Sequence, residues 1–317
     1  MQIFRQLTLA LSGLSINSKW TPVSHSVHNE IGNQEPLPSK PEAIVLWHGL
    51  GDNYNTTSMG RIKELIENTL PDTFVHSVYI DEDPALDERR SIFGDANSEL
   101  AIACEQLLQI PELSNGFAGI GFSQGGLFMR ALIEKCPNIS VSTLITFGSP
   151  HLGVLELPLC PKDDDWLCKR RNAFLKSQVW LPLVQKTVIP AQYFRDPAQY
   201  SSYTKYSHFL ANINNERPEE IDEDAKERFS QIGRLVLIKF TKDTTLVPKE
   251  SAFFEEVDPH TGRTVPFTKT QLFQDDLIGL RKLFIEDKVS FYDIDDEHMR
   301  FLDDFFVDIL HEYFGAP

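Results

Sequence analysis

Short, continuous apolar runs recur along this chain and alternate with stretches in which apolar residues return every three or four positions. The first kind has the length and unbroken hydrophobicity of a strand buried on both faces of a parallel sheet, and the second has the period of an amphipathic helix. Strands that alternate with helices predict a mostly parallel, doubly wound sheet. The strand-like runs lie at residues 43–47, 74–80, 116–121, 142–147, 235–240 and 289–292, and the helix-like stretches at 59–70, 97–108, 124–135 and 300–314.

Two regions before the core and one within it depart from this alternation. Residues 1–18 hold one basic residue and a short apolar run, as a signal peptide does. Residues 19–41 are polar and carry prolines, and we interpret them as an irregular leader. We expect residues 42–317 to form a single domain. Within it, residues 151–230 or thereabouts are too long for a plain connection, so we interpret them as a helical cap inserted into the core.

The balance of charge restricts the partners. The chain has 46 acidic against 30 basic side chains, a formal net charge of -16. Such a surface repels phosphate backbones, so we expect no nucleic-acid partner. No run approaches the roughly 18 apolar residues that a membrane-spanning helix needs, so we expect no transmembrane segment either.

The four cysteines lack the paired CxxC spacing of a structural zinc site. From their number alone, disulfides and buried free thiols both remain open. No motif for a metal or a phosphate group is present, so we expect no metal and no cofactor. Asn55 and Asn138 each begin an N-glycosylation pattern. The cysteines are Cys104, Cys136, Cys160 and Cys168.

A possible nucleophile lies in the sequence Gly-Phe-Ser-Gln-Gly at residues 121–125. This pattern follows a strand-like run directly and opens a helix-like stretch, which is the setting of a nucleophile elbow. The flanking glycines leave room for a sharp turn and for close passage of the helix against the strand. We therefore predict that Ser123 is the nucleophile of an α/β-hydrolase.

A serine hydroxyl needs a base to take its proton, and in this class the acid and then the histidine follow the serine along the chain. His298 lies in a predicted loop between a late strand and the last helix, so we predict that it is the base. Asp243 follows the strand-like run at 235–240 and could orient the imidazole. Its rival, Asp258, lies in a charge-rich segment that is more easily explained as solvated surface, so we favour Asp243.

Two backbone N–H groups are usually needed to stabilise the oxyanion of the tetrahedral intermediate. One comes from the residue after the nucleophile and the other from the turn after an early strand. Gln124 and Leu50 occupy these positions. We predict that both donate through the backbone.

Longer motifs around the glycine turn and the serine narrow the class of hydrolase further. Leu-Trp-His-Gly-Leu-Gly-Asp at 46–52 and Gly-Phe-Ser-Gln-Gly-Gly at 121–126 are far more selective than the general hydrolase pattern. With further matches up to residues 276–280, the chain resembles the palmitoyl-protein thioesterase family, lysosomal enzymes that remove long-chain fatty acyl groups from protein cysteines. The resemblance places the triad on Ser123, Asp243 and His298 and the oxyanion donors on Leu50 and Gln124.

The resemblance also implies two disulfides, Cys104–Cys136 and Cys160–Cys168, and a lumenal location in a lysosome or vacuole, or secretion. It implies S-acylated proteins or peptides as substrates. A lipase or carboxylic esterase remains an alternative, because a serine triad alone cannot distinguish an oxygen ester from a thioester. A catalytically silent lipid-binding protein is a second alternative. Apolar residues that either line an acyl groove or pack internally are Phe174, Leu175, Val179, Trp180, Leu181, Leu183 and Val184.

Overall fold

The computed structural model describes residues 43–157 and 176–315 of the chain. The proposed signal peptide and leader therefore lie outside the described residues. So do Phe174, Leu175 and both cysteines of the second expected disulfide, Cys160 and Cys168.

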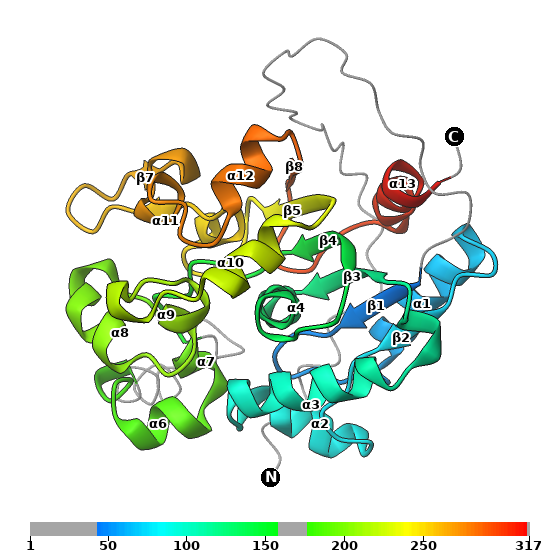
Figure 1. Cartoon of the computed structure of the whole chain (residues 1–317), viewed down its shortest axis with the longest axis horizontal. Coiled ribbons are helices and arrows are strands. Elements are labelled where there is room, and N and C mark those ends of the chain that lie inside the picture. Colours follow the sequence, from blue (N-terminus) through cyan, green and yellow to red (C-terminus); the bar gives the residue numbers. More distant parts are fainter. Residues whose placement is uncertain (1–42, 158–175, 316–317) are drawn as a thin grey trace.

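A six-stranded parallel sheet forms the centre of the molecule, in the order β2-β1-β3-β4-β5-β8 (Figure 1). Each of the six predicted runs became one of its strands, which confirms the α/β class predicted from the alternation. Strands β1 and β3 are wholly apolar and buried, as expected for strands covered on both faces. The strands are β1 (Ile44–Trp47), β2 (Val75–Ser77), β3 (Phe117–Phe122), β4 (Val141–Phe147), β5 (Arg234–Phe240) and β8 (Val289–Ile294).

Helices cover both faces of this sheet (Figure 1). Ile44 and Leu46 pack with α1 (Thr57–Thr69) and α13 (Asp303–Phe314), whereas the alternate residues Val45 and Trp47 pack with α3 (Ala96–Leu108) and α4 (Gln124–Lys135). This alternation follows from the two-residue period of a strand. No helix in the described ranges is long and apolar enough to cross a membrane. The short α2 (Pro84–Ile92) precedes α3.

Between β4 and β5, the described part of the segment expected to be a cap is helical. Figure 1 shows α6 to α9 gathered on the side to which the strand arrowheads point. Its apolar residues have different environments: Val179 is 1% exposed, whereas Leu181 and Leu183 are 49% and 73% exposed. The helices here are α6 (Pro182–Thr187), α7 (Ile189–Gln192), α8 (Tyr200–Tyr206), α9 (Leu210–Ile213) and α10 (Glu223–Ser230), the last of which packs on α4.

Small elements complete the chain between β5 and β8. They are the hairpin strands β6 (Glu256–Val257) and β7 (Thr264–Val265) and the helices α11 (Gln271–Gln274) and α12 (Leu280–Ile285). Short 3-10 helices occur at Pro111–Leu113, Pro197–Gln199, Pro218–Glu220, Lys249–Phe253 and Phe267–Lys269.

A disulfide between Cys104 and Cys136 joins α3 to the residue that follows α4. Its two cysteines are 32 positions apart in the sequence. This is one of the two bridges that the family resemblance implies.

Candidate active site

Ser123 lies at the sharp turn between β3 and α4, with φ of 52° and ψ of −123°. A residue other than glycine in this region costs about 1–3 kcal/mol, so the surrounding structure must hold it there. The Ser123 N–H donates to the Phe147 carbonyl at 2.7 Å. A Cβ on Gly121 would lie 2.3 Å from the Gly126 Cα, and one on Gly125 would lie 2.3 Å from the Trp47 carbonyl oxygen. The flanking glycines are therefore required by close contact, as an elbow requires.

The structure brings the three predicted side chains together in one hydrogen-bonded series. His298 lies in the loop between β8 and α13, and its Nε2 is 3.0 Å from the Ser123 Oγ. Its Nδ1 is 2.5 Å from Oδ2 of Asp243, which follows β5. These contacts form because parallel strands deliver the loops at their carboxyl ends to the same edge of the sheet.

Asp243 is held in place by its own surroundings. Its side chain is buried, and its Oδ1 accepts hydrogen bonds from the N–H groups of Thr245 and Leu246, both at 2.8 Å. Oδ2 is thus left to face the imidazole. Asp258, the rival candidate, instead accepts from the N–H groups of His260 and Thr261 in the turn between β6 and β7.

This arrangement can increase the nucleophilicity of the serine. With Nδ1–H donating to the carboxylate, Nε2 is the unprotonated nitrogen and can accept the Ser123 proton. The carboxylate then stabilises the imidazolium that forms. Within residues 43–157 and 176–315, no group of three histidine, cysteine or acidic side chains could hold a metal ion.

The glycine turn after β1 passes directly against Ser123. A Cβ on Gly49 would lie 3.2 Å from the Ser123 Cβ, so the turn that carries Leu50, the next residue, runs beside Ser123. Gln124 is the first residue of α4, and the first N–H groups of a helix have no partner within it. Both backbone positions predicted for oxyanion donors therefore lie next to the serine.

No sequence motif indicated three side chains that lie near these two predicted donor positions. Asp87 contacts His48 in the glycine turn at 3.1 Å. The Ser91 Oγ accepts from the Gly51 N–H at 2.7 Å. The Tyr193 hydroxyl donates to the Gln124 side chain at 3.0 Å. In the sequence, only the four-residue spacing of Asp87 and Ser91 hints that both lie on one face of a helix.

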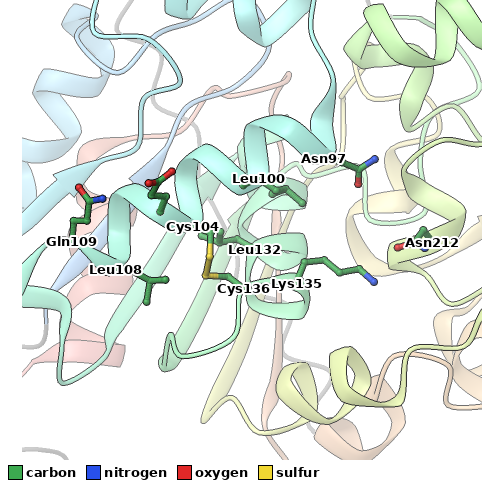
Figure 2. Close-up of a pocket in the computed structure, with 11 residues that line it drawn as sticks. Asn97, Leu100, Cys104, Leu108, Gln109, Leu132, Lys135, Cys136 and Asn212 are labelled. Carbon is green, nitrogen blue, oxygen red and sulfur yellow. A yellow bond between two sulfur atoms is a disulfide. The ribbon is translucent and has the colours of Figure 1, made fainter.

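A cavity of about 550 Å³ lies elsewhere, beside the Cys104–Cys136 disulfide (Figure 2). It is lined mainly by α3 and the last turns of α4, including Leu100, Leu132 and Lys135. At 1.5 Å per residue, the length of α4 separates this end of the helix from Ser123 by roughly 18 Å. The cavity is therefore separate from the Ser123–His298–Asp243 series.

Comparison with known proteins agrees with this geometry. A sequence model of the family described as palmitoyl protein thioesterase matches residues 43–298. The chain belongs to the palmitoyl-protein thioesterase family. The match spans every strand of the central sheet and all three residues of the hydrogen-bonded series, so the resemblance read from the sequence motifs is confirmed.

Individual relatives in this thioesterase family cover most of the chain. It is 36% identical over 281 residues to palmitoyl-protein thioesterase 1 of Caenorhabditis elegans, covering 87% of this chain and 93% of the relative. It is 32% identical to palmitoyl-protein thioesterase 3 of Dictyostelium discoideum, over 81% of this chain and 84% of the relative. It is also 27% identical to the lysosomal thioesterase PPT2 of Rattus norvegicus, over 78% and 80% of the two chains. These relatives are thioesterases by name, and they support a thioesterase function.

Proposed function

We propose that this protein hydrolyses long-chain fatty acyl thioesters, such as palmitoyl groups on protein cysteines, with Ser123, His298 and Asp243 as its catalytic triad. The observation that carries the proposal is the series of contacts from Ser123 through His298 to Asp243, in a chain that belongs to this family. The substrates are S-acylated proteins or peptides. The reaction uses no metal or cofactor.

In the first half of the reaction, the Ser123 Oγ attacks the thioester carbonyl carbon while Nε2 of His298 takes its proton. The carbonyl oxygen becomes an oxyanion and accepts hydrogen bonds from the backbone N–H groups of Leu50 and Gln124. The carbon–sulfur bond then breaks and the cysteine thiolate leaves, with His298 supplying its proton. A thiolate is a good leaving group because the parent thiol has a pKa of about 8.5.

In the second half, a water molecule attacks the acyl-serine. His298 takes a proton from the water and returns one to the Ser123 Oγ as the fatty acid leaves. Asp243 holds the imidazole in its tautomer through both halves. The enzyme is thereby restored to its starting state.

Residues 151–230 act as a cap over this site within a single domain at 42–317. Tyr193, between α7 and α8, supports this role, because its hydroxyl reaches the side chain of Gln124 beside the nucleophile.

The direct test is hydrolysis of an S-palmitoyl cysteine peptide by the purified protein. His298→Ala should lower kcat by at least about 10⁴-fold, as removal of a triad member does in other serine hydrolases. The matched control is His260→Ala, because His260 is an exposed histidine in the turn after β6. Equal activity of the two variants would contradict the triad.

Two further measurements separate the alternatives. Matched palmitoyl ester and thioester substrates compare an esterase or lipase with a thioesterase, and we expect the thioester to have the higher kcat/KM. A fluorophosphonate probe should label the folded wild-type protein and leave Ser123→Ala unlabelled. Absence of labelling in the wild type would favour a catalytically silent lipid-binding protein.

The protein acts in the lumen of a lysosome or vacuole, reached through a signal peptide and the secretory pathway. The Cys104–Cys136 disulfide supports an oxidising route, and Asn55 and Asn138 are exposed and accessible to glycosylation. Glycosidase treatment should increase the mobility of the expressed protein, and Asn55→Gln with Asn138→Gln should abolish that shift. A full-length, unglycosylated protein in the cytosol would contradict this location.

A further inference from the structure

Helix α2 buries an unusual face. The two residues that it buries are Asp87 and Ser91, one turn apart, and both are polar. A buried carboxylate or hydroxyl is costly unless hydrogen bonds replace its water, so the partners of these two side chains explain why α2 packs where it does. Those partners lie in the glycine turn after β1, in the segment after β2 and, for Ser91, within α2 itself.

Asp87 holds the first half of the glycine turn. Its Oδ2 accepts from the His48 Nε2 at 3.1 Å and from the Tyr54 N–H at 3.0 Å, so one carboxylate oxygen binds both ends of the segment 48–54. Its Oδ1 accepts from the Ile80 N–H at 2.7 Å and the Asp81 N–H at 3.3 Å. The carboxylate is 1% exposed, so these bonds are shielded from water.

His48 connects Asp87 to the peptide group that carries the Leu50 N–H. Its Nε2 faces Asp87 and its Nδ1 is 3.0 Å from the Gly49 carbonyl oxygen, so both ring nitrogens face acceptors. Burial by itself lowers the pKa of His48, but the hydrogen bond and charge of Asp87 outweigh burial, and the pKa is raised. The Gly49 carbonyl and the Leu50 N–H belong to one planar peptide group, so fixing the carbonyl fixes the direction of the N–H.

Ser91 holds the other side of Leu50 and also reaches Gln124. Its Oγ accepts from the Gly51 N–H at 2.7 Å and donates to the Glu88 carbonyl at 2.7 Å. Its own carbonyl oxygen accepts from the Gln124 Nε2 at 3.0 Å. Ser91 is thus bonded to Gly51, which follows Leu50, and to the side chain of Gln124. Leu50 and Gln124 are the two residues assigned as oxyanion donors.

We propose that Asp87 and Ser91 are positioning residues that fix the two oxyanion donors, Asp87 through His48 and Ser91 through Gly51 and Gln124. The inference rests on the proposed function, because it takes Leu50 and Gln124 as the donors. Neither residue contacts the reacting atoms. Their effect is to set the direction of the donors before charge develops on the substrate oxygen, which is where preorganised donors act.

The test compares a ligand that forms an oxyanion with one that does not. With a palmitoyl trifluoromethyl ketone, the Ser123 Oγ adds to the ketone carbon, the serine proton passes to His298 and the ketone oxygen becomes an oxyanion. The matching palmitoyl thioether binds without any such bond. Affinities of both ligands are measured for wild type and Ser91→Ala, together with kcat and KM on the S-palmitoyl peptide.

The matched control is Ser230→Ala. Ser230 is also buried in a helix and also donates to the carbonyl three residues earlier, at 2.9 Å to Glu227, but it bonds to neither the glycine turn nor Gln124. We expect Ser91→Ala to weaken the ketone by about 10-fold and to lower kcat similarly, since a donor is displaced rather than removed. For Ser91→Ala, thioether affinity and KM should stay within about twofold of wild type. Ser230→Ala should change neither the affinity for the two ligands nor kcat or KM.

Equal weakening of both ligands, or of neither, would overturn the proposal. If Ser91→Ala is not folded at the assay temperature, the isosteric Asp87→Asn is measured in the same way and is expected to weaken the ketone selectively. Failure of the proposed function gives a different result: the wild-type protein would neither bind the ketone more tightly than Ser123→Ala nor cleave the peptide faster than that variant.

Discussion

At its N-terminal end, helix α4 is held by backbone atoms in close contact, whereas its C-terminal half is held by side chains that reach to other elements. The first turn fits only because Gly125 brings its backbone against the Trp47 carbonyl and Gly126 fits against Ser149, leaving no room for a Cβ at either position. This tight packing places Ser123 and Gln124.

The C-terminal half is anchored by charge and by a covalent bond. Arg130 is fully buried and bonds to Glu134 at 3.1 Å and to the Asn214 side chain at 2.7 Å. Lys135 pairs with Asp222 near the start of α10, and the disulfide follows at Cys136. The contrast implies that changes at the first end should remove chemistry, whereas changes at the second should remove stability and spare turnover.

The largest effect is expected from Gly125→Ala. The added Cβ would lie 2.3 Å from the Trp47 carbonyl oxygen and 2.4 Å from that of His48, both of which are backbone atoms. We expect the free energy of unfolding to fall by about 3 kcal/mol or more and fluorophosphonate labelling to be lost. Gly60→Ala in α1 is the control, because nothing lies within 4 Å of the new Cβ there. Normal labelling of Gly125→Ala would contradict the close contact.

The next effect is expected from Arg130→Met, measured by chemical denaturation. The change leaves the buried Glu134 carboxylate without its cation, and breaking a buried pair in this way costs about 3–5 kcal/mol. Arg130→Met combined with Glu134→Leu should regain most of that stability because both charges of this pair are removed together. In both variants, kcat per folded molecule should stay within about twofold of wild type. A large fall in kcat would show that the two ends of α4 are coupled.

The disulfide should have a somewhat smaller effect. Cys104→Ser with Cys136→Ser opens a crosslink between residues 32 positions apart, which should cost about 2–4 kcal/mol. Thermal melting of the variant and of wild-type protein, both without reductant, is the measurement. The melting temperature should fall while kcat is unchanged, since the bridge lies at the end of α4 remote from Ser123. Loss of kcat in a folded variant would contradict this separation.

The smallest effect is expected on the pH dependence of stability, through Glu99. This residue is buried in α3, the helix that the disulfide joins to the end of α4. Burial raises the pKa of Glu99 to about 8, with Arg90 opposing and Asp87 and Asp95 adding to the shift. The folded protein holds this proton more tightly than the unfolded chain does. Protonated Glu99 therefore contributes fully to the free energy of unfolding below about pH 4.5, and this contribution is lost as pH rises through about 8.

Wild-type protein should therefore be more stable at pH 5 than at pH 8, with Glu99 supplying on the order of 1–3 kcal/mol of that difference. Glu99→Gln cannot ionise and should flatten this part of the profile. Thermal melting of both proteins across this range is the measurement. An unchanged slope in the variant would show that other groups carry the pH dependence.

The sheet and the residues at its carboxyl edge could be predicted from the sequence because both depend on local order. Each strand is a continuous apolar run, and Ser123, Asp243 and His298 each follow one of these runs closely. In a parallel sheet, such positions converge whatever the length of chain between them.

The side chains that hold the glycine turn and Gln124 could not be predicted in this way. The contact of His48 with Asp87 spans 39 positions, and that of Tyr193 with Gln124 spans 69. Such pairs depend on how helices pack against the rest of the fold. The spacing of apolar residues along the sequence predicts single helices and strands but not how they pack together. The same limit applies to Leu181 and Leu183, whose apolar character suggested either groove or core, although both are exposed.

His298, the proposed base, contacts Ser123 from 175 residues further along the chain, on the loop that follows the edge strand β8. A polypeptide emerging from the ribosome thus carries the proposed nucleophile long before the histidine that we propose activates it. In the proposed mechanism, the serine has no proton acceptor until β8 docks on β5, so a chain in which β8 has not docked should not hydrolyse thioesters. Hydrolytic activity of this enzyme is consequently a sensitive measure of whether folding has gone to completion.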